Sequence, residues 1–156
     1  MKREFYTYKL ILDTLPKGVS EDDFRRIITR AAGYMKWATS GRVEFQEVLS
    51  VPAQHEWHVN IGFDELRRGA CGNYMNLNGV KSIAFDPTWK WSTRWWHVLF
   101  SKRENLYAVA VHELGHLIGL KHVPQAWDSV MSPHPAFGEF TDIELAELRR
   151  GRLYDP

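Results

Sequence analysis

The amino-acid sequence predicts a single α/β domain (of the α+β kind) in which a twisted mixed β-sheet packs against helices. The chain has 156 residues, the usual length of one domain and enough for a buried core without disulfide bonds. A hydrophobic content of 44% and a charged content of 25% are typical of a folded globular chain. Strand-like and helix-like patterns follow in the order strand, helix, several strands, helix, helix. We therefore expect residues 1–156 to form one domain with two long helices and a C-terminal helix.

The first elements are a strand and a long amphipathic helix. Residues Phe5 to Leu12 are rich in aromatic and β-branched side chains, which favour extended backbone. Ser20 and Asp23 then form a capping-box pattern, which marks a helix N-terminus. We expect this helix to end near residues 39–41. Its apolar stripe, spaced as one helical face, consists of Phe24, Ile27, Ile28, Ala31 and Met35.

Further strands follow the first helix. Val43 to Leu49 alternates between apolar and polar residues, and Trp57 to Phe63 is a second such stretch. Val80 to Phe85 is rich in strand-forming residues and is ended by Asp-Pro. Residues 67–79 contain three glycines and three asparagines, which are typical of a loop. We expect a short edge strand near Tyr74 within this loop.

Two more helices are predicted in the second half of the chain. A capping box formed by Ser101 and Glu104 predicts a helix that continues to Leu117 or Ile118. A third capping box precedes a C-terminal helix that we expect to run to about Arg150. Its two residues are Thr141 and Glu144.

Charge and cysteine content exclude several functional classes. The net charge of +1 and the pI near 7.9 give no basic surface of the kind that binds nucleic acid or anionic lipid. With one cysteine, Cys71, the chain forms no internal disulfide bond. No apolar run has membrane-spanning length, and residues 1–13 are typical of a strand, not of a signal peptide. We expect a monomer without nucleic-acid or membrane partners, either an intracellular or virion protein or the mature domain of a secreted one.

The stretch VAVHELGHLIGLKHVPQAWDSVMSP, residues 109–133, contains the candidate active site. His112 and His116 are four residues apart, so on a helix their imidazole rings lie on the same face. Two neutral imidazoles in this arrangement can bind one metal ion, and imidazole suits zinc. Glu113 projects about a quarter turn away, where it can act as a general base on a water molecule beside the metal.

A catalytic zinc needs a third protein ligand and one open position. His122 is the candidate ligand, but six residues from His116 it has the wrong phase for the same helix face. Gly119 lies between them, and a glycine at a helix C-terminus can adopt the left-handed conformation that turns the chain back. The spacing therefore predicts a zinc site made of His112, His116 and His122.

These residues resemble the metzincin pattern HExxHxxGxxH, which a Met-turn follows, and Met131 in DSVMSP is then the Met-turn residue. Among the metzincins the chain most resembles the matrixins, the matrix metalloproteinase family. The resemblance continues along nearly the whole chain and implies a metzincin-like fold. Its segments are YTYKLIL with the helix that follows, VEFQEV, HVNIGF, IAFDPTWKWS and FTDIELAELRRGRLY.

The resemblance implies a zinc-dependent metalloendopeptidase with one catalytic zinc on His112, His116 and His122. The zinc would bind a water molecule, and Glu113 would accept its proton as the water attacks a peptide bond. Met131 would support the site from beneath without being a ligand. A peptide or protein substrate would add to an exposed sheet edge, held by main-chain hydrogen bonds.

The substrate pocket is expected beside the Met-turn. Pro133 matches the proline that follows the matrixin Met-turn, but His134 and Pro135 stand where a tyrosine is expected. We expect the side chain after the scissile bond to contact Pro133, His134 and Phe137. The shape of this pocket therefore differs from the family pattern.

Other departures concern further metals and the cysteine. Ala84 stands where the resemblance places a histidine of a second, structural zinc, and His55 and His58 do not fit that pattern, so one zinc is predicted. Asp86 is the candidate ligand for calcium, whose presence stays open. Cys71 is either a small, partly buried thiol or a zinc ligand in a latent state.

Alternative interpretations of the motif stay open. One is a helix with unrelated, solvated histidines, and another is a structural zinc without chemistry, although structural sites rarely keep a glutamate beside an open position. At the level of function, the alternative to a peptidase is a zinc-containing protein-interaction module with no or very narrow proteolytic activity. Glu113 argues against that module, whereas a blocked cleft would favour it.

Overall fold

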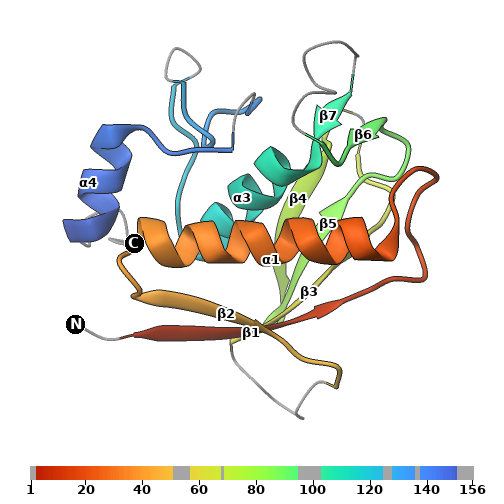
Figure 1. Ribbon diagram of the computed structural model, residues 1–156, viewed down its shortest axis with the longest axis horizontal. Coiled ribbons are helices and arrows are strands. Elements are labelled where there is room, and N and C mark those ends of the chain that lie inside the picture. The colour runs from red at the N-terminus through yellow and green to blue at the C-terminus, as the bar shows by residue number, and fades with distance from the viewer. Residues whose placement is uncertain are drawn as a thin grey trace.

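The protein is a layered α/β fold in which two helices cover one face of a five-stranded mixed sheet (Figure 1). The predicted fold class is thereby confirmed. This computed structural model describes residues 3–50, 57–67, 69–94, 103–124, 128–135 and 138–150.

The sheet has the strand order β2-β1-β3-β5-β4. The strands β1, β2, β3 and β5 run parallel to their neighbours, while β4 pairs antiparallel with β5 at one edge. The predicted edge strand near Tyr74 is β4. The bounds are β1 Glu4–Leu10, β2 Val43–Glu47, β3 His58–Phe63, β4 Gly72–Leu77 and β5 Val80–Phe85.

The strands β1 and β2 each end two residues before the predicted Leu12 and Leu49. The apolar side chain of Leu49 is 87% exposed, so it continues the sequence pattern without joining the core. Alternate residues of the strands face the helices and are buried. In the three central strands these residues are Tyr6, Tyr8, Leu10, Val59, Ile61, Phe63, Ile83 and Phe85.

Helix α1 (Glu21–Ala38) lies across the sheet, in front of it in the view of Figure 1. The hydroxyl of Ser20 accepts a hydrogen bond of 3.1 Å from the backbone N–H of Asp23, which is the predicted N-cap. Phe24 is fully buried and packs against Phe63 and Phe85, with ring centroids 5.2 and 6.1 Å away. These contacts join the helix to the sheet layer below it.

Helix α3 (Leu106–Leu117) begins five residues after the predicted cap Ser101, which lies outside the described residues. The cap is Asn105, whose side-chain oxygen accepts a hydrogen bond of 3.2 Å from the N–H of the third helical residue. Residues Glu104–Asn105 (β7) are extended because they pair with Trp91–Ser92 (β6) in a separate two-stranded sheet. The prediction was wrong because a tertiary strand pairing overrides a local capping pattern.

Helix α4 (Asp142–Arg150) packs beside the C-terminal end of α1, on the left of Figure 1. The predicted capping box is confirmed, since the hydroxyl of Thr141 accepts a 3.2 Å hydrogen bond from the N–H of Glu144. In return, the carboxylate of Glu144 accepts a 2.7 Å hydrogen bond from the N–H of Thr141. This carboxylate is buried, which becomes important for the site below.

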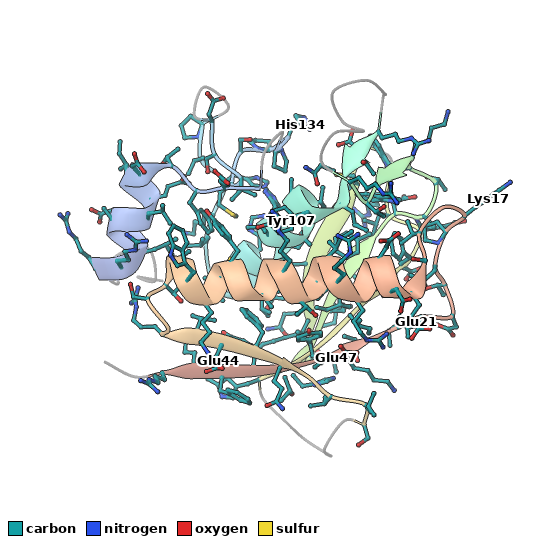
Figure 2. All side chains as sticks on the ribbon, in the orientation of Figure 1. Lys17, Glu21, Glu44, Glu47, Tyr107 and His134 are labelled. Carbon is teal, nitrogen blue, oxygen red and sulfur yellow. The ribbon has the colours of Figure 1, made fainter. Side chains whose placement is uncertain are left out.

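No helix among the described residues combines the length and the apolar surface that crossing a membrane requires. The longest of them, α1, carries charged side chains on its outer face, several of which are visible in Figure 2. Arg25 bonds Glu21 at 2.8 Å, and Lys36 bonds Glu44 at 2.7 Å. Such exposed pairs contribute little to stability but keep this face hydrated.

Candidate metal centre and active site

Three histidine side chains converge at the C-terminal half of α3. The Nε2 atom of His112 lies 3.0 Å from that of His116 and 3.1 Å from that of His122. The Nε2 atoms of His116 and His122 are 3.2 Å apart. The structure therefore brings together the three predicted ligands, one nitrogen from each ring facing a common point.

Backbone carbonyl groups fix the orientation of two of these rings. The Nδ1 atom of His112 lies 2.6 Å from the carbonyl oxygen of Val130, and Nδ1 of His116 lies 2.8 Å from that of Leu120. A carbonyl oxygen only accepts hydrogen bonds, so each Nδ1 carries the proton and each neutral ring presents a lone pair at Nε2. Two lone pairs facing each other at 3.0 Å repel, and a cation between them removes that repulsion.

The donor set fits a zinc ion. Tetrahedral zinc with ligand distances near 2.0–2.1 Å places two nitrogen ligands about 3.3 Å apart, close to the separations of these atoms. Among the described residues, these histidines form a group whose ligand atoms all lie within 4.8 Å of one another. His112 is buried while His122 is exposed, so the group opens toward the cleft on one side.

Gly119 turns the chain from α3 back toward the site. Its φ of +94° lies in the left-handed region, as the sequence predicts. The N–H of Gly119 bonds the carbonyl of His116 at 3.0 Å, and the N–H of Leu120 bonds the carbonyl of Gly115 at 2.9 Å. This pair of hydrogen bonds is a Schellman motif. The motif places the carbonyl oxygen of Leu120 within hydrogen-bond distance of the His116 ring. It also lets His122, which lies beyond the helix, reach the other two histidines.

Met131 lies in a turn that packs against α3 and is 1% exposed. This turn, residues 129–132, is called the Met131 turn below. A side chain at Gly115 would place its Cβ 2.5 Å from the sulfur of Met131, so the glycine lets the methionine pack directly against α3. The carbonyl of Met131 accepts a 3.0 Å hydrogen bond from the N–H of Val123, next to His122. The turn thus supports both the helix and the returning segment.

A buried carboxylate holds the Met131 turn from behind. Glu144, 4% exposed, accepts a 2.6 Å hydrogen bond from the hydroxyl of Ser129. The oxygen of that hydroxyl accepts a 2.9 Å bond from the N–H of Met131. Val130 lies between Ser129 and Met131 in the sequence, and its carbonyl oxygen accepts the hydrogen bond from His112. A continuous chain of hydrogen bonds and backbone therefore joins the start of α4 to a predicted metal ligand.

The side chain of Glu113 lies in the same cleft. It is 4% exposed, and burial raises the pKa of its carboxyl group from 4.5 to about 7, although the backbone N–H of Tyr74 donates a hydrogen bond that lowers it. A Cβ at Gly72 would lie 2.7 Å from the carboxylate, so this glycine of β4 leaves the space that Glu113 occupies. A carboxyl group whose pKa is near neutral suits general acid–base work.

Two of the histidines favour the neutral form that metal binding requires. The pKa of His112 is lowered to about 4, chiefly by burial, with charge on His116 and His122 acting in the same direction and the hydrogen bond to Val130 acting against it. Burial also lowers the pKa of His122, with smaller contributions from His116 and His134. Neither ring competes strongly for a proton at neutral pH.

A cleft of about 390 Å³ extends over the site, between β4 and the segment after the Met131 turn. Pro133 and His134 line it, and Figure 2 places His134 above α3, while the predicted Phe137 lies outside the described residues. Cys71 lines the cleft as well, but its thiol does not belong to the converging metal-binding group. Burial raises the pKa of Cys71 to about 11, with Glu104 the next contribution, which disfavours the thiolate that binds metal.

The residues at the expected positions of a structural zinc and of calcium contact protein groups instead. Ala84 lies buried on β5, and the ring of His58 is 3.0 Å from the hydroxyl of Thr7 through Nδ1. The carboxylate of Asp86 accepts hydrogen bonds from the N–H of Leu66 at 3.0 Å and from Thr88. Asp86 therefore orders its loop, and calcium stays a prediction without an identified ligand set.

The sequence of this chain also matches a known protein family. A model of the matrixin family matches residues 2–147. The chain belongs to the matrixin family. Matrixins are zinc metalloendopeptidases. The three converging histidines form a group that could hold such a metal ion.

Three matrixin relatives show how low the sequence identity to known members of the family is. Human neutrophil collagenase is 27% identical over 137 residues, which cover 83% of this chain and 27% of that protein. Human matrix metalloproteinase-21 is 26% identical over 147 residues, 84% of this chain and 24% of the relative. Metalloendoproteinase 4-MMP of Arabidopsis thaliana is 29% identical over 136 residues, 81% of this chain and 38% of the relative. The chain spans less than two fifths of the length of these relatives.

The structure adds residues to the site that the sequence did not single out. Val130 and Leu120 act through backbone carbonyls, which leave no trace in a sequence pattern. Glu144 is recognisable from the sequence only as a helix cap, and Ser129 only as a polar neighbour of Met131. Their roles require the fold that brings α4 behind the turn.

Glu144→Gln tests the buried hydrogen-bond chain. The amide replaces one accepting oxygen with a donor, so one of the donors on Ser129 and Thr141 is left facing a donor. We expect unfolding free energy to fall by about 1–3 kcal/mol and zinc affinity to fall about tenfold. Urea unfolding and competition with a chromophoric chelator measure both. Glu147→Gln, on the same helix and paired with the exposed Arg150, is the matched control and should change neither by much.

The raised pKa of Glu113 predicts a pH-dependent effect of Glu113→Gln on the stability of the metal-free protein. The unfolded carboxyl group loses its proton near pH 4.5, whereas the folded one keeps it until about pH 7. Between these values the folded state binds more protons, so Glu113 destabilises it as pH rises. The variant should gain stability over the wild type by up to about 1.4 kcal/mol per pH unit across this interval. Urea unfolding at several pH values tests this, and a pH-independent difference would contradict it.

Proposed function

We propose that this chain is a zinc-dependent endopeptidase that acts as a single catalytic domain and a monomer. The observation that carries the proposal is the position of Glu113: a buried carboxyl group with a pKa of about 7 in the same cleft as three converging histidine nitrogens. Membership in the matrixin family supports the reaction class. The natural substrate would be a peptide or protein.

His112, His116 and His122 would hold the metal through their Nε2 atoms. When bound, a zinc ion supplies Lewis acidity that makes water acidic and polarises a carbonyl group. The carbonyl groups of Val130 and Leu120 keep two of the rings in the required tautomer. One zinc is the proposed catalytic cofactor, and Asp86, the candidate calcium ligand, accepts hydrogen bonds from Leu66 and Thr88.

Glu113 would move the proton during hydrolysis. As general base it takes a proton from the water that attacks the scissile carbonyl, and as general acid it gives the proton to the leaving amine. A pKa near 7 lets the group do both at neutral pH. The hydrogen bond from the Tyr74 N–H and the space at Gly72 fix the carboxylate at the wall of the cleft.

The substrate would bind as an extra strand along β4. The carbonyl of Cys71 bonds the N–H of Asp86 on the β5 side, while the N–H of Tyr74 points to Glu113 in the cleft. Because successive residues of a strand alternate in direction, the backbone groups of Gly72 and Tyr74 face the cleft. An extended peptide can pair with this free edge. Its side chain after the scissile bond would contact Pro133 and His134, with Phe137 as a further proposed contact.

The decisive experiment compares the wild type with Glu113→Gln, both loaded with zinc, on a mixed peptide library read by mass spectrometry. The variant should keep one zinc per chain and lose about 10²–10⁴-fold in kcat/KM, since it lacks the proton-transferring group. His122→Ala is the companion variant that should lose zinc together with activity. Zinc binding without cleavage by the wild type would contradict the peptidase and favour an interaction module.

A further inference from the structure

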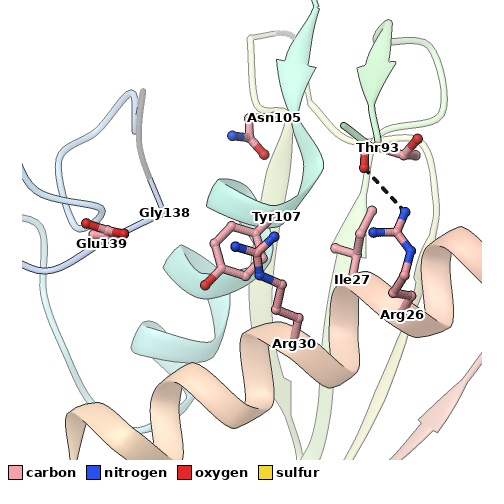
Figure 3. Close-up of a pocket in the computed structure, with 8 residues that line it drawn as sticks. All are labelled: Arg26, Ile27, Arg30, Thr93, Asn105, Tyr107, Gly138 and Glu139. Atoms are coloured by element: carbon pink, nitrogen blue, oxygen red, sulfur yellow. Dashed lines mark hydrogen bonds between the residues drawn. The ribbon is translucent and has the colours of Figure 1, made fainter. Parts of the chain in front are cut away.

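A second cavity, of about 250 Å³, lies on the side of α3 that faces α1 (Figure 3). It is bounded by α1, by Thr93, by the first turn of α3 and by the segment that begins at Gly138. Among the described residues, none lines both this cavity and the metal cleft. Its wall combines apolar surface with the polar side chains of Arg30, Asn105 and Glu139.

The guanidinium group of Arg30 is held by stacking on an aromatic ring. It lies over the ring of Tyr107, 4.7 Å from the centroid, and Figure 3 shows the two stacked at the centre of the cavity wall. Within the described part of the chain, Arg30 has this contact and no hydrogen bond or ion pair. Stacking fixes the plane of the guanidinium but leaves the N–H groups along its edge free to donate.

Asn105 contributes a second oriented donor. Its side-chain oxygen caps α3 by accepting the hydrogen bond from Ala108 N–H at 3.2 Å. That bond fixes the amide, and Asn105 lines the cavity, so its NH₂ group is held at one position in the cavity wall (Figure 3). A capping asparagine that also lines a cavity is thus a donor at a fixed position.

Tyr107 contributes the face of its ring, and Figure 3 shows its hydroxyl oxygen at the end of the ring that points away from Asn105. Burial raises the pKa of this phenol. The opposite wall carries the carboxylate of Glu139, which forms no ion pair with Arg30 in the described residues. Among the described residues, the cavity therefore has the donors of Arg30 and Asn105 on one side and the carboxylate of Glu139 across from them.

Arg26 reinforces the positive side. It lies one helical turn before Arg30, is fixed by Asp23 at 2.6 Å, and reaches the carbonyl of Thr93 at 3.5 Å. Two like charges four residues apart on a helix repel each other. An anion between the arginine side chains would relieve that repulsion.

We propose that this cavity binds a carboxylate group, held by Arg30 and Asn105. A planar, singly charged carboxylate matches the edge of one uncommitted guanidinium in a bidentate arrangement. The carboxylate of Glu139 across the cavity disfavours a doubly charged phosphate and accepts a hydrogen bond from an N–H group of the ligand. The ligand class is therefore an acidic side chain or the C-terminus of a peptide, each of which offers a carboxylate beside an amide N–H. The site is separate from the proposed hydrolysis.

The test follows the side-chain N–H signals of Arg30 and Asn105 by NMR in the zinc-loaded full chain at constant ionic strength. The probes are N-acetylglycine, which imitates a peptide C-terminus, N-acetylglutamate amide, which imitates an acidic side chain, and inorganic phosphate. We expect saturable shifts with one or both carboxylates at millimolar concentration. The tighter of the two identifies the source, and the local signals separate this site from carboxylate binding at the zinc.

Three variants make the test specific. Asn105→Asp keeps the helix cap but replaces the donor with a negative charge, and Arg30→Gln removes the guanidinium. Each should weaken carboxylate binding at least tenfold. Lys17→Gln removes one exposed positive charge outside the cavity and should leave the affinity unchanged. Absence of saturable shifts, tighter binding of phosphate than of both carboxylates, or equal weakening by Lys17→Gln would overturn the proposal.

Discussion

Two backbone carbonyl groups determine the chemistry of this site. The carbonyl oxygens of Val130 and Leu120 each accept a hydrogen bond from the Nδ1–H of a histidine, which leaves the Nε2 lone pairs of His112 and His116 facing each other at 3.0 Å. Such an arrangement is unfavourable without a cation, so a fold that maintains it must be stabilised elsewhere. The matrixin fold supplies that stability through elements far from the metal-binding nitrogens.

The supporting elements act in layers. Helix α1 clamps the sheet through Phe24, and the sheet presents the edge strand β4 to α3. Behind the site, the carboxylate of Glu144 fixes the Met131 turn, and the turn fixes both Val130 and the segment that carries His122. On the other side of α3, beside β4, burial raises the pKa of the Glu113 carboxyl group. Metal binding and proton transfer thus both depend on the packing around α3.

The sequence predicts the parts of the site that depend on spacing along one helix. His112, Glu113 and His116 follow from helical periodicity, and Gly119 from the need for a left-handed turn, which its φ of +94° confirms. The start of α3 was mispredicted at Ser101, because the pairing of β6 with β7 delays the helix until Asn105. The bond between Ser129 and Glu144, fifteen residues apart, and the cavity at Arg30 depend on tertiary arrangement, which no local pattern records.

The tautomers of the three histidines test the central claim most directly. Two-bond ¹H–¹⁵N correlation spectra of the metal-free and zinc-loaded chain report which ring nitrogen carries the proton. We expect His112 and His116 to be neutral with the proton on Nδ1 in both states at pH 7, and the Nε2 signals of all three rings to shift when one equivalent of zinc is added. A proton on Nε2 of His112 or His116 in either state, or Nε2 signals that zinc leaves unchanged, would contradict the account.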